Sequence, residues 1–529
     1  MALPVERRPG AHAVPAAVLA AALSAAVCAA HIASFSAHPL FGYPVVDARW
    51  HYEWASAVAR GDVFSYAPYF RAPLYPWLLG ALFALTGPGV LQGTILSAVL
   101  VIACSAAFSA AASRFADRTP ALLISLAWAC WAPMFFLSGT LLIEPLYILL
   151  LLGSFLLLDS GRPAWGLFLL GLSAIARPGS ILLLPLAVHR TGLLPGLKRL
   201  PLFLLPLAAV WSVNALRGDP GDLVSSQGGI NLYLGNGPEA DGHTAFAPVW
   251  VPRTPGEPYS DNVEAASIRL APQGLSPSAV SSWWTARAVR SALESPLRWL
   301  SLMGRKVLYM LSPLEIPGNY DMYYCRRYSL PLRILLLPSP LCVPAVLVLL
   351  MLPGALAAGR LSRADIFAAL WSALLALGVV LFFVTSRLRL PCIPFVLLPV
   401  ASRFARRWKR GLALAPAGAL LAAGLVLATG GSVSDSGVNM PFYDALANYG
   451  AGRVDTARAL FVESLERAYS RTDGVSLNRT EALYDLGLLE AGEGRTEAAE
   501  GWFRAALEDN PGFEPAARAL ELLGAHGEL

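Results

Sequence analysis

Charged residues are scarce in this chain. They make up 14% of its 529 residues, whereas hydrophobic residues make up 56%. An average soluble protein carries about 25% charged residues, so the composition excludes an ordinary soluble globular protein. We therefore expect a polytopic membrane protein with an all-α fold, because a chain that crosses the bilayer many times does so most simply as helices.

Cysteine is also rare. Five of the six cysteines lie in apolar segments, where cysteine packs as a small hydrophobic residue, and only Cys325 lies in a polar stretch. The sequence contains no CxxC or HExxH spacing and no nucleotide-binding motif. We therefore expect no disulfide framework and no nucleic-acid partner. No metal or other cofactor is indicated, although a divalent metal is left open.

The charges that are present are unevenly distributed. From Ser432 onward, 8 lysines and arginines stand against 17 acidic residues, whereas the preceding part has 32 against 18. Such an asymmetry indicates two different environments. We expect a membrane domain over residues 1–430 and a soluble acidic helical domain over residues 431–529.

The apolar stretches predict how often the chain crosses the membrane. A span needs about 20 mostly apolar residues, and every second connection between the candidate spans is basic, as the positive-inside rule requires for cytoplasmic loops. We expect a bacterial-type inner-membrane protein with an uncleaved signal anchor, a cytoplasmic N-terminus and a periplasmic or external C-terminal domain. The eleven candidate spans are residues 12–34, 89–112, 119–138, 141–158, 163–176, 178–190, 200–217, 331–357, 364–385, 390–404 and 411–430.

Two longer segments of the membrane domain then face the outside as loops, residues 35–88 and residues 218–330. The first contains "FRAPLYPWLLGALFALTG", an apolar run that is short for a span and begins with prolines. We expect it to form an interfacial or re-entrant helix.

The acidic tail contains a repeat. "GRVDTARALFVESL" (452–465) aligns with "GRTEAAEGWFRAAL" (494–507) at an offset of 42 residues. Small and aromatic residues at fixed helical offsets are typical of tetratricopeptide repeats, whose period is about 34 residues. We attribute the excess to the polar insert "RTDGVSLNR". The resulting helical module is either a packing cap or, as we favour, a surface that docks a protein partner.

Several charged and aromatic side chains lie close together next to the first span, in residues 43–62, "YPVVDARWHYEWASAVARGD". In a helix, Asp47 and His51 share a face, and Arg49 can pair with Glu53 four residues later. The two tryptophans of the segment also share a face, which favours a helix anchored in the headgroup layer. His51 is equally compatible with a site and with an interface. Asp47 taken alone is best explained as a helix N-cap.

Five further stretches, taken together with this one, resemble a known family. They are "FRAPLYPWLLGALFALTG", "SGTLLIEPLYILLLLGSFLLL", "GLSAIARPGSILLLPLAV", "NALRGDPGDLVSSQGGINLYLGNGPEADG" and "FFVTSRLRLPCIPFVLLPVA". In order and spacing, from about residue 10 to 405, they resemble the GT-C superfamily of membrane glycosyltransferases. They are most similar to family-39 proteins related to protein O-mannosyltransferases and to aminoarabinose and lipopolysaccharide-core transferases. Many members have two adjacent acidic residues where this chain has Asp47 followed by Ala48.

The resemblance implies a function and a site. Such enzymes transfer a sugar, with inversion, from a polyprenyl-phosphate donor to a glycan, lipid or protein acceptor outside the membrane, and Asp47 is then the general base. Arginines suit the phosphate of the donor. The other implied site residues are Arg71, Arg177, Arg387, Arg389, Glu144 and His51, with Asn231 and Asn236 as sugar or acceptor contacts.

Simpler structural roles remain open for several of these residues. Arg387 and Arg389 can snorkel from a helix end, and Glu144 can pair with Arg177. Asn231 and Asn236 also fit a Gly/Asn-rich turn. At the level of the whole protein, the alternatives are a transporter or flippase for lipid-linked glycans and a membrane-anchored scaffold that displays the repeats.

Overall fold

The protein is built from helices. The computed structural model describes residues 13–243, 259–336, 343–433, 439–469 and 478–526. Helices account for about 79% of the protein, and the described ranges contain no β-strand. The expected all-α class is therefore confirmed at this level.

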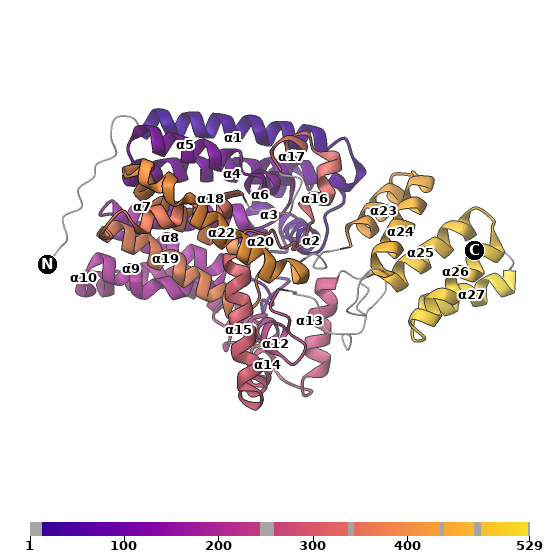
Figure 1. Ribbon diagram of the computed structural model, residues 1–529. Coiled ribbons are helices and arrows are strands. Elements are labelled where there is room, and N and C mark those ends of the chain that lie inside the picture. Colours follow the sequence, from indigo (N-terminus) through magenta and orange to yellow (C-terminus); the bar gives the residue numbers. More distant parts are fainter. Residues whose placement is uncertain (1–12, 244–258, 337–342, 434–438, 470–477, 527–529) are drawn as a thin grey trace.

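Within the part of the chain that the structure describes, six helical stretches are long and apolar enough to cross a membrane. A seventh span results if α5 (Arg118–Ala129) and α6 (Ala132–Phe136), which meet at a bend of 46°, are counted as one. Figure 1 shows α1, α4 and α5 running side by side. The six stretches are α1 (Ala13–Phe35), α4 (Val90–Phe115), α10 with α11 (Leu193–Lys198 and Leu200–Leu216), α19 (Arg363–Val380), α20 with α21 (Ser386–Arg389 and Ile393–Arg406) and α22 (Trp408–Val433).

Among the described residues, fewer helices are long and apolar enough to span a membrane than the eleven spans predicted. Four predicted spans correspond to shorter helices, and residues 337–342 of the predicted span 331–357 lie outside the described residues. The longest of the four has 16 residues, about 24 Å at 1.5 Å per residue, whereas the hydrocarbon core is about 30 Å thick. The shorter helices are α7 (Glu144–Asp159), α8 (Pro163–Ala176), α9 (Leu184–Thr191) after the 3₁₀ turn η3 (Pro178–Leu183), and α18 (Val343–Leu356).

Prolines define where several of these short helices end. Arg177 has an extended backbone because Pro178 follows it, and α8 therefore stops at Ala176. Pro145 lies in the first turn of α7, the position at which a helix tolerates proline. The breaks leave Glu144 and Arg177 at the ends of their helices, at the same end of the bundle.

The segment from residue 35 to 88 folds into two packed helices, α2 (Asp47–Ala59) and α3 (Leu74–Thr86). Gly80 allows the close approach of the two helices, since a Cβ there would lie 2.5 Å from the Cβ of Val58.

The prediction that Trp50 and Trp54 anchor α2 in the headgroup layer is wrong. They are only 5% and 0% exposed, and they pack against aromatic rings of the following loop.

The segment expected to be a long loop, residues 218–330, is largely helical. Four of its helices extend sideways from the bundle in Figure 1. They are α12 (Gly228–Asn236), α13 (Tyr259–Leu270), α14 (Pro277–Glu294) and α15 (Pro296–Leu311). The remaining short elements of the membrane domain are η1 (Pro39–Gly42), η2 (Leu137–Gly139), α16 (Met322–Cys325), η4 (Arg326–Tyr328), α17 (Leu330–Leu335) and η5 (Leu390–Cys392).

The acidic tail forms a separate helical module with its own apolar core. Its two aligned sequence copies have the same local backbone, because each begins with a glycine with positive φ, +74° at Gly452 and +73° at Gly494. Phe461 and Phe503, which also align, are both buried in that core. Most of the polar insert, residues 470–477, lies outside the described residues. The module comprises α23 (Met440–Gly450), α24 (Val454–Tyr469), α25 (Arg479–Gly492), α26 (Thr496–Asp509) and α27 (Glu514–His526).

Candidate functional site

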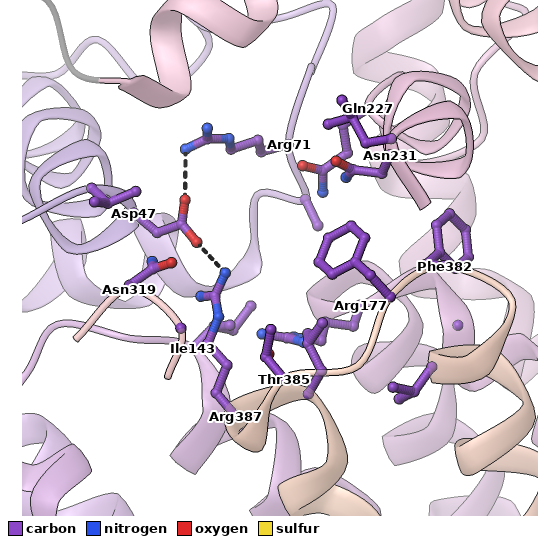
Figure 2. Close-up of a pocket in the computed structure, with 18 of the residues that line it drawn as sticks. Asp47, Arg71, Ile143, Arg177, Gln227, Asn231, Asn319, Phe382, Thr385 and Arg387 are labelled. Carbon is purple, nitrogen blue, oxygen red and sulfur yellow. Dashed lines mark ion pairs between the residues drawn. The ribbon is translucent and has the colours of Figure 1, made fainter. Parts of the chain in front are cut away.

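A cavity of about 370 Å³ lies at the end of the bundle that carries α2. It is bounded by helix ends and by the segments between helices, which is where the prolines leave polar side chains. Figure 2 shows Asp47 between the guanidinium groups of Arg71 and Arg387, with Arg177 on another wall. Of the predicted site residues, the cavity is lined by Asp47, His51, Arg71, Arg177, Asn231 and Arg387.

Asp47 is the first residue of α2 and does not act as its N-cap. Val46 precedes it with φ +49° and ψ −120°, and no side chain caps the helix. A positive φ is rare for a β-branched residue and costs about 1–3 kcal/mol. The residue before it is held by a tertiary contact, since the backbone N–H of Val45 donates to the hydroxyl of Tyr320 at 3.1 Å. The turn directs the Asp47 carboxylate into the cavity, and the N-terminus of α2 favours its negative charge.

Two carboxylates and three arginines form a chain of ion pairs through the cavity wall. Asp47 pairs with Arg71 at 3.4 Å and with Arg387 at 2.7 Å. Arg387 also lies 3.6 Å from Glu144, whose carboxylate is fully buried and pairs with Arg177. The expected pair of Glu144 with Arg177 is thus confirmed, and Arg387 joins the two acidic groups.

Burial and neighbouring charges set the protonation states of Asp47 and His51. Burial raises the pKa of Asp47, but Arg387 and Arg71 together with His51 lower that pKa further, so that the net result lies well below the usual range. Burial lowers the pKa of His51 to about 4 against the opposing effect of Asp47. His51 is therefore neutral near pH 7, and its Nδ1–H donates to the carbonyl of Leu141 at 2.8 Å.

The cavity contains polar residues that the sequence did not single out. Gln227 lies across from Asp47, next to the predicted Asn231, and Asn319 lies beside Asp47 (Figure 2). The hydroxyl of Thr385 is buried and has no hydrogen-bond partner among the described residues. Thr385 precedes Arg387 in "TSRLRLP", so the arginine pattern marked the right segment without pointing to the hydroxyl.

One wall of the cavity is apolar. It includes Leu375, Gly378 and Val379 from the last turns of α19, one of the helices long and apolar enough to span a membrane. Phe382 and Phe383 continue this wall toward Arg387. The cavity therefore joins a cationic region to an apolar region that begins on a helix long and apolar enough to span a membrane.

Three of the predicted site residues do not line the cavity. Glu144 is buried beside it and pairs with Arg177 and Arg387. The other two lie elsewhere. Arg389 is 2% exposed and donates to the carbonyls of Tyr309, Ser312 and Leu314 and to the carboxylate of Glu315. Asn236 is also buried, where it donates to the carbonyls of Leu232 and Leu381 and accepts from Trp299 and Lys306. Neither side chain lines the cavity, and both hold neighbouring elements together.

The described residues contain no group of three or more histidine, cysteine, aspartate or glutamate side chains placed to hold a metal ion. Comparison of the chain with protein-family models, with curated proteins and with solved structures found no match. The functional argument therefore rests on the chemistry of the cavity.

Proposed function

We propose that this protein is an integral membrane glycosyltransferase that takes a sugar from a polyprenyl-phosphate donor. The observation that carries this proposal is that one cavity combines a cationic end with an apolar wall. Three arginines at one end suit a phosphate, and an apolar wall at the other end begins on a membrane-spanning helix. A lipid that carries a phosphate near the membrane surface has this distribution of charge and apolar surface.

The phosphate, the lipid chain and the sugar of the donor can each be matched to a region of the cavity. Arg387, Arg71 and Arg177 are placed to meet the phosphate oxygens, and the buried hydroxyl of Thr385 offers a neutral donor beside them. The first carbons of the lipid chain would lie along Val379 and Phe382 toward the end of α19. The sugar would then occupy the space in front of Asp47.

Asp47 would act as the general base. The acceptor hydroxyl oxygen attacks the anomeric carbon and forms the new glycosidic bond, while the bond from that carbon to the phosphate oxygen breaks. The electron pair of the broken bond leaves with the phosphate, and the hydroxyl proton passes to the Asp47 carboxylate. Attack opposite to the leaving phosphate inverts the anomeric configuration.

The ion pairs connect donor binding to this step. A carboxylate held by two guanidinium groups is a weak base, because both cations stabilise its charged form. A phosphate that binds Arg387 and Arg71 competes with Asp47 for the same N–H groups. Donor binding would thereby raise the pKa of Asp47 toward the range in which it accepts a proton.

The connections near Asp159, at the end of α7 away from the cavity, are basic, because they include Arg114, Arg162 and Arg190. This supports an orientation with the cavity and the repeat module outside the cytoplasm. The repeat module lies at the same end of the molecule as α2, whereas α9 and α10 lie at the opposite end (Figure 1). Cavity and module would therefore share the periplasmic or external side.

The test is mass spectrometry of surface glycans and lipid-linked sugars in a deletion strain that carries wild type or a variant. Asp47→Asn should abolish transfer, so that one sugar is missing from a glycan and its polyprenyl-phosphate donor accumulates. Asp159→Asn is the matched control. Asp159 is also held by two arginines, but it lies at the far end of α7, about 22 Å along the helix from Glu144. Glycans that stay unchanged in the deletion strain would exclude the transferase and favour the membrane-anchored scaffold, whereas glycan loss that Asp47→Asn restores in full would favour transport of a lipid-linked glycan.

A further inference from the structure

The repeat module closes the cavity on one side. Asn439 and Tyr443 at the start of α23, together with Asn478 and Glu481 at the start of α25, line the same cavity as Asp47. The module therefore contributes a wall of the candidate site in addition to having a surface of its own.

The module is held in place by buried polar contacts. Asp444 on α23 is fully buried and accepts hydrogen bonds from the hydroxyls of Tyr324 at 2.7 Å and Tyr328 at 2.5 Å. A second link joins Arg327 to Glu463 at 3.2 Å. Because a buried carboxylate that loses its partners is costly, these contacts fix the module against the membrane domain, and Tyr443, next to Asp444, is fixed with it.

The wall from the module differs chemically from the wall it faces. Among the described residues that line the cavity, the module contributes two amides, a phenol and a carboxylate, and it contributes no cation. Burial raises the pKa of Tyr443, so the phenol stays neutral and can both donate and accept a hydrogen bond. A phosphate is attracted to the arginines of the opposite wall and repelled by Glu481. The module's wall is therefore suited to a second, uncharged molecule.

We infer that the repeat module forms the acceptor subsite and that the acceptor is a carbohydrate. Amide, phenol and carboxylate groups around one aromatic ring recognise a ligand that carries many hydroxyls and an apolar ring face. A hydroxyl of that ligand would then point across the cavity toward Asp47. This inference rests on the proposed transferase function and adds the class of the acceptor and the wall that selects it.

Two conservative substitutions test the inference in the full-length protein. Tyr443→Phe removes a hydroxyl and Glu481→Gln removes a charge, and both keep the size of the side chain. Tyr449→Phe and Glu500→Gln are the matched controls, since they lie on the same module but do not line the cavity. Each variant is examined for the sugar content of the surface glycan in the deletion strain. Each purified variant is also examined for binding of undecaprenyl phosphate in detergent.

We expect the double variant Tyr443→Phe/Glu481→Gln to reduce transfer at least tenfold, while its affinity for undecaprenyl phosphate stays within about twofold of wild type. The sugar that wild type transfers should be found linked to another sugar. Unchanged transfer in the double variant would overturn the acceptor subsite while leaving the transferase in place, provided that Asp47→Asn is inactive. A product linked to protein or lipid would overturn the carbohydrate class. Loss of undecaprenyl phosphate binding would show that the module's wall serves the donor.

Discussion

At the scale of single residues, Asp47 occupies the arginines that a phosphate would use. Asp47→Asn should therefore strengthen the binding of undecaprenyl phosphate, although we expect it to abolish the proposed transfer. Removing the competing carboxylate predicts a dissociation constant lower by about tenfold, equivalent to about 1.4 kcal/mol. Titration of the purified protein in detergent measures this directly.

Asp159→Asn serves as the control for that titration, because it removes the same kind of charge from a similarly paired site outside the cavity. Its affinity for undecaprenyl phosphate should equal that of wild type. An unchanged or weaker affinity in Asp47→Asn would mean that the phosphate does not bind Arg387 and Arg71.

His51 gives the site a pH dependence. Because burial lowers its pKa to about 4 in the folded protein, against about 6.5 in an unfolded chain, the unfolded state binds more protons between these values. Stability contributed by neutral His51 is thus fully present above about pH 6.5 and is lost as the pH falls toward 4. The charged groups that act on His51 are Asp47, Arg71 and Glu144.

Thermal unfolding of the purified protein between pH 7 and 4 measures this loss. His51→Gln should have a smaller drop in melting temperature over this range than wild type, because the glutamine does not titrate. An equal drop in both proteins would assign the pH dependence to other groups.

Individual residues also show what the sequence could and could not predict of the site. The pairs of Arg177 with Glu144 and of Arg49 with Glu53 were predictable, the first because a carboxylate in an apolar run needs a cation and the second from helical spacing. Arg389 has the same local pattern as Arg387, yet it binds carbonyls from a segment some 75 residues away. Such a difference depends on tertiary contacts that no local pattern contains.

At the scale of elements, α2 carries Asp47 and depends on its contact with α3. Gly80→Ala should push the helices apart, because its Cβ would come within 2.5 Å of Val58 and 3.0 Å of the Ala55 carbonyl. Overpacking of this kind costs about 1–3 kcal/mol. We expect a lower melting temperature and reduced transfer. Gly304→Ala, a helical glycine with open space around it, should cost neither, and equal losses in both variants would show that the contact between α2 and α3 is not responsible.

The sequence predicted which segments form apolar helices, but it did not distinguish helices long enough to span a membrane from shorter buried ones. Apolar composition predicted α7, α8 and α9, but the hydropathy of a short helix buried among other helices equals that of a span. The two differ in whether the helix is as long as the bilayer is thick. The breaks at Pro145 and Pro178 set the lengths of these helices. The tryptophans of α2 were misplaced for a similar reason, since an apolar face can turn toward protein as well as toward lipid.

At the scale of the whole molecule, Asp444 joins the two parts of the chain. Asp444→Ala leaves the hydroxyls of Tyr324 and Tyr328 without their acceptor, so the module should separate from the membrane domain. We expect faster proteolysis between residues 430 and 440 and reduced transfer, with the module itself still folded around its own core. Asp455→Ala, in which a 95% exposed carboxylate is removed from the same module, should have neither effect. If both variants resist protease like wild type, Asp444 does not hold the module.

The chain of ion pairs also determines the charge of the cavity at each stage of the proposed reaction. At the donor end of the cavity, with Glu481 on the opposite wall left aside, three arginines and two carboxylates leave one positive charge, with His51 neutral. A phosphodiester donor brings about one negative charge and neutralises the site. After transfer the carrier phosphate holds about two negative charges, but Asp47 has gained the proton, so neutrality persists. Once Asp47 releases that proton to water, the surplus is negative, and the cavity repels the spent carrier.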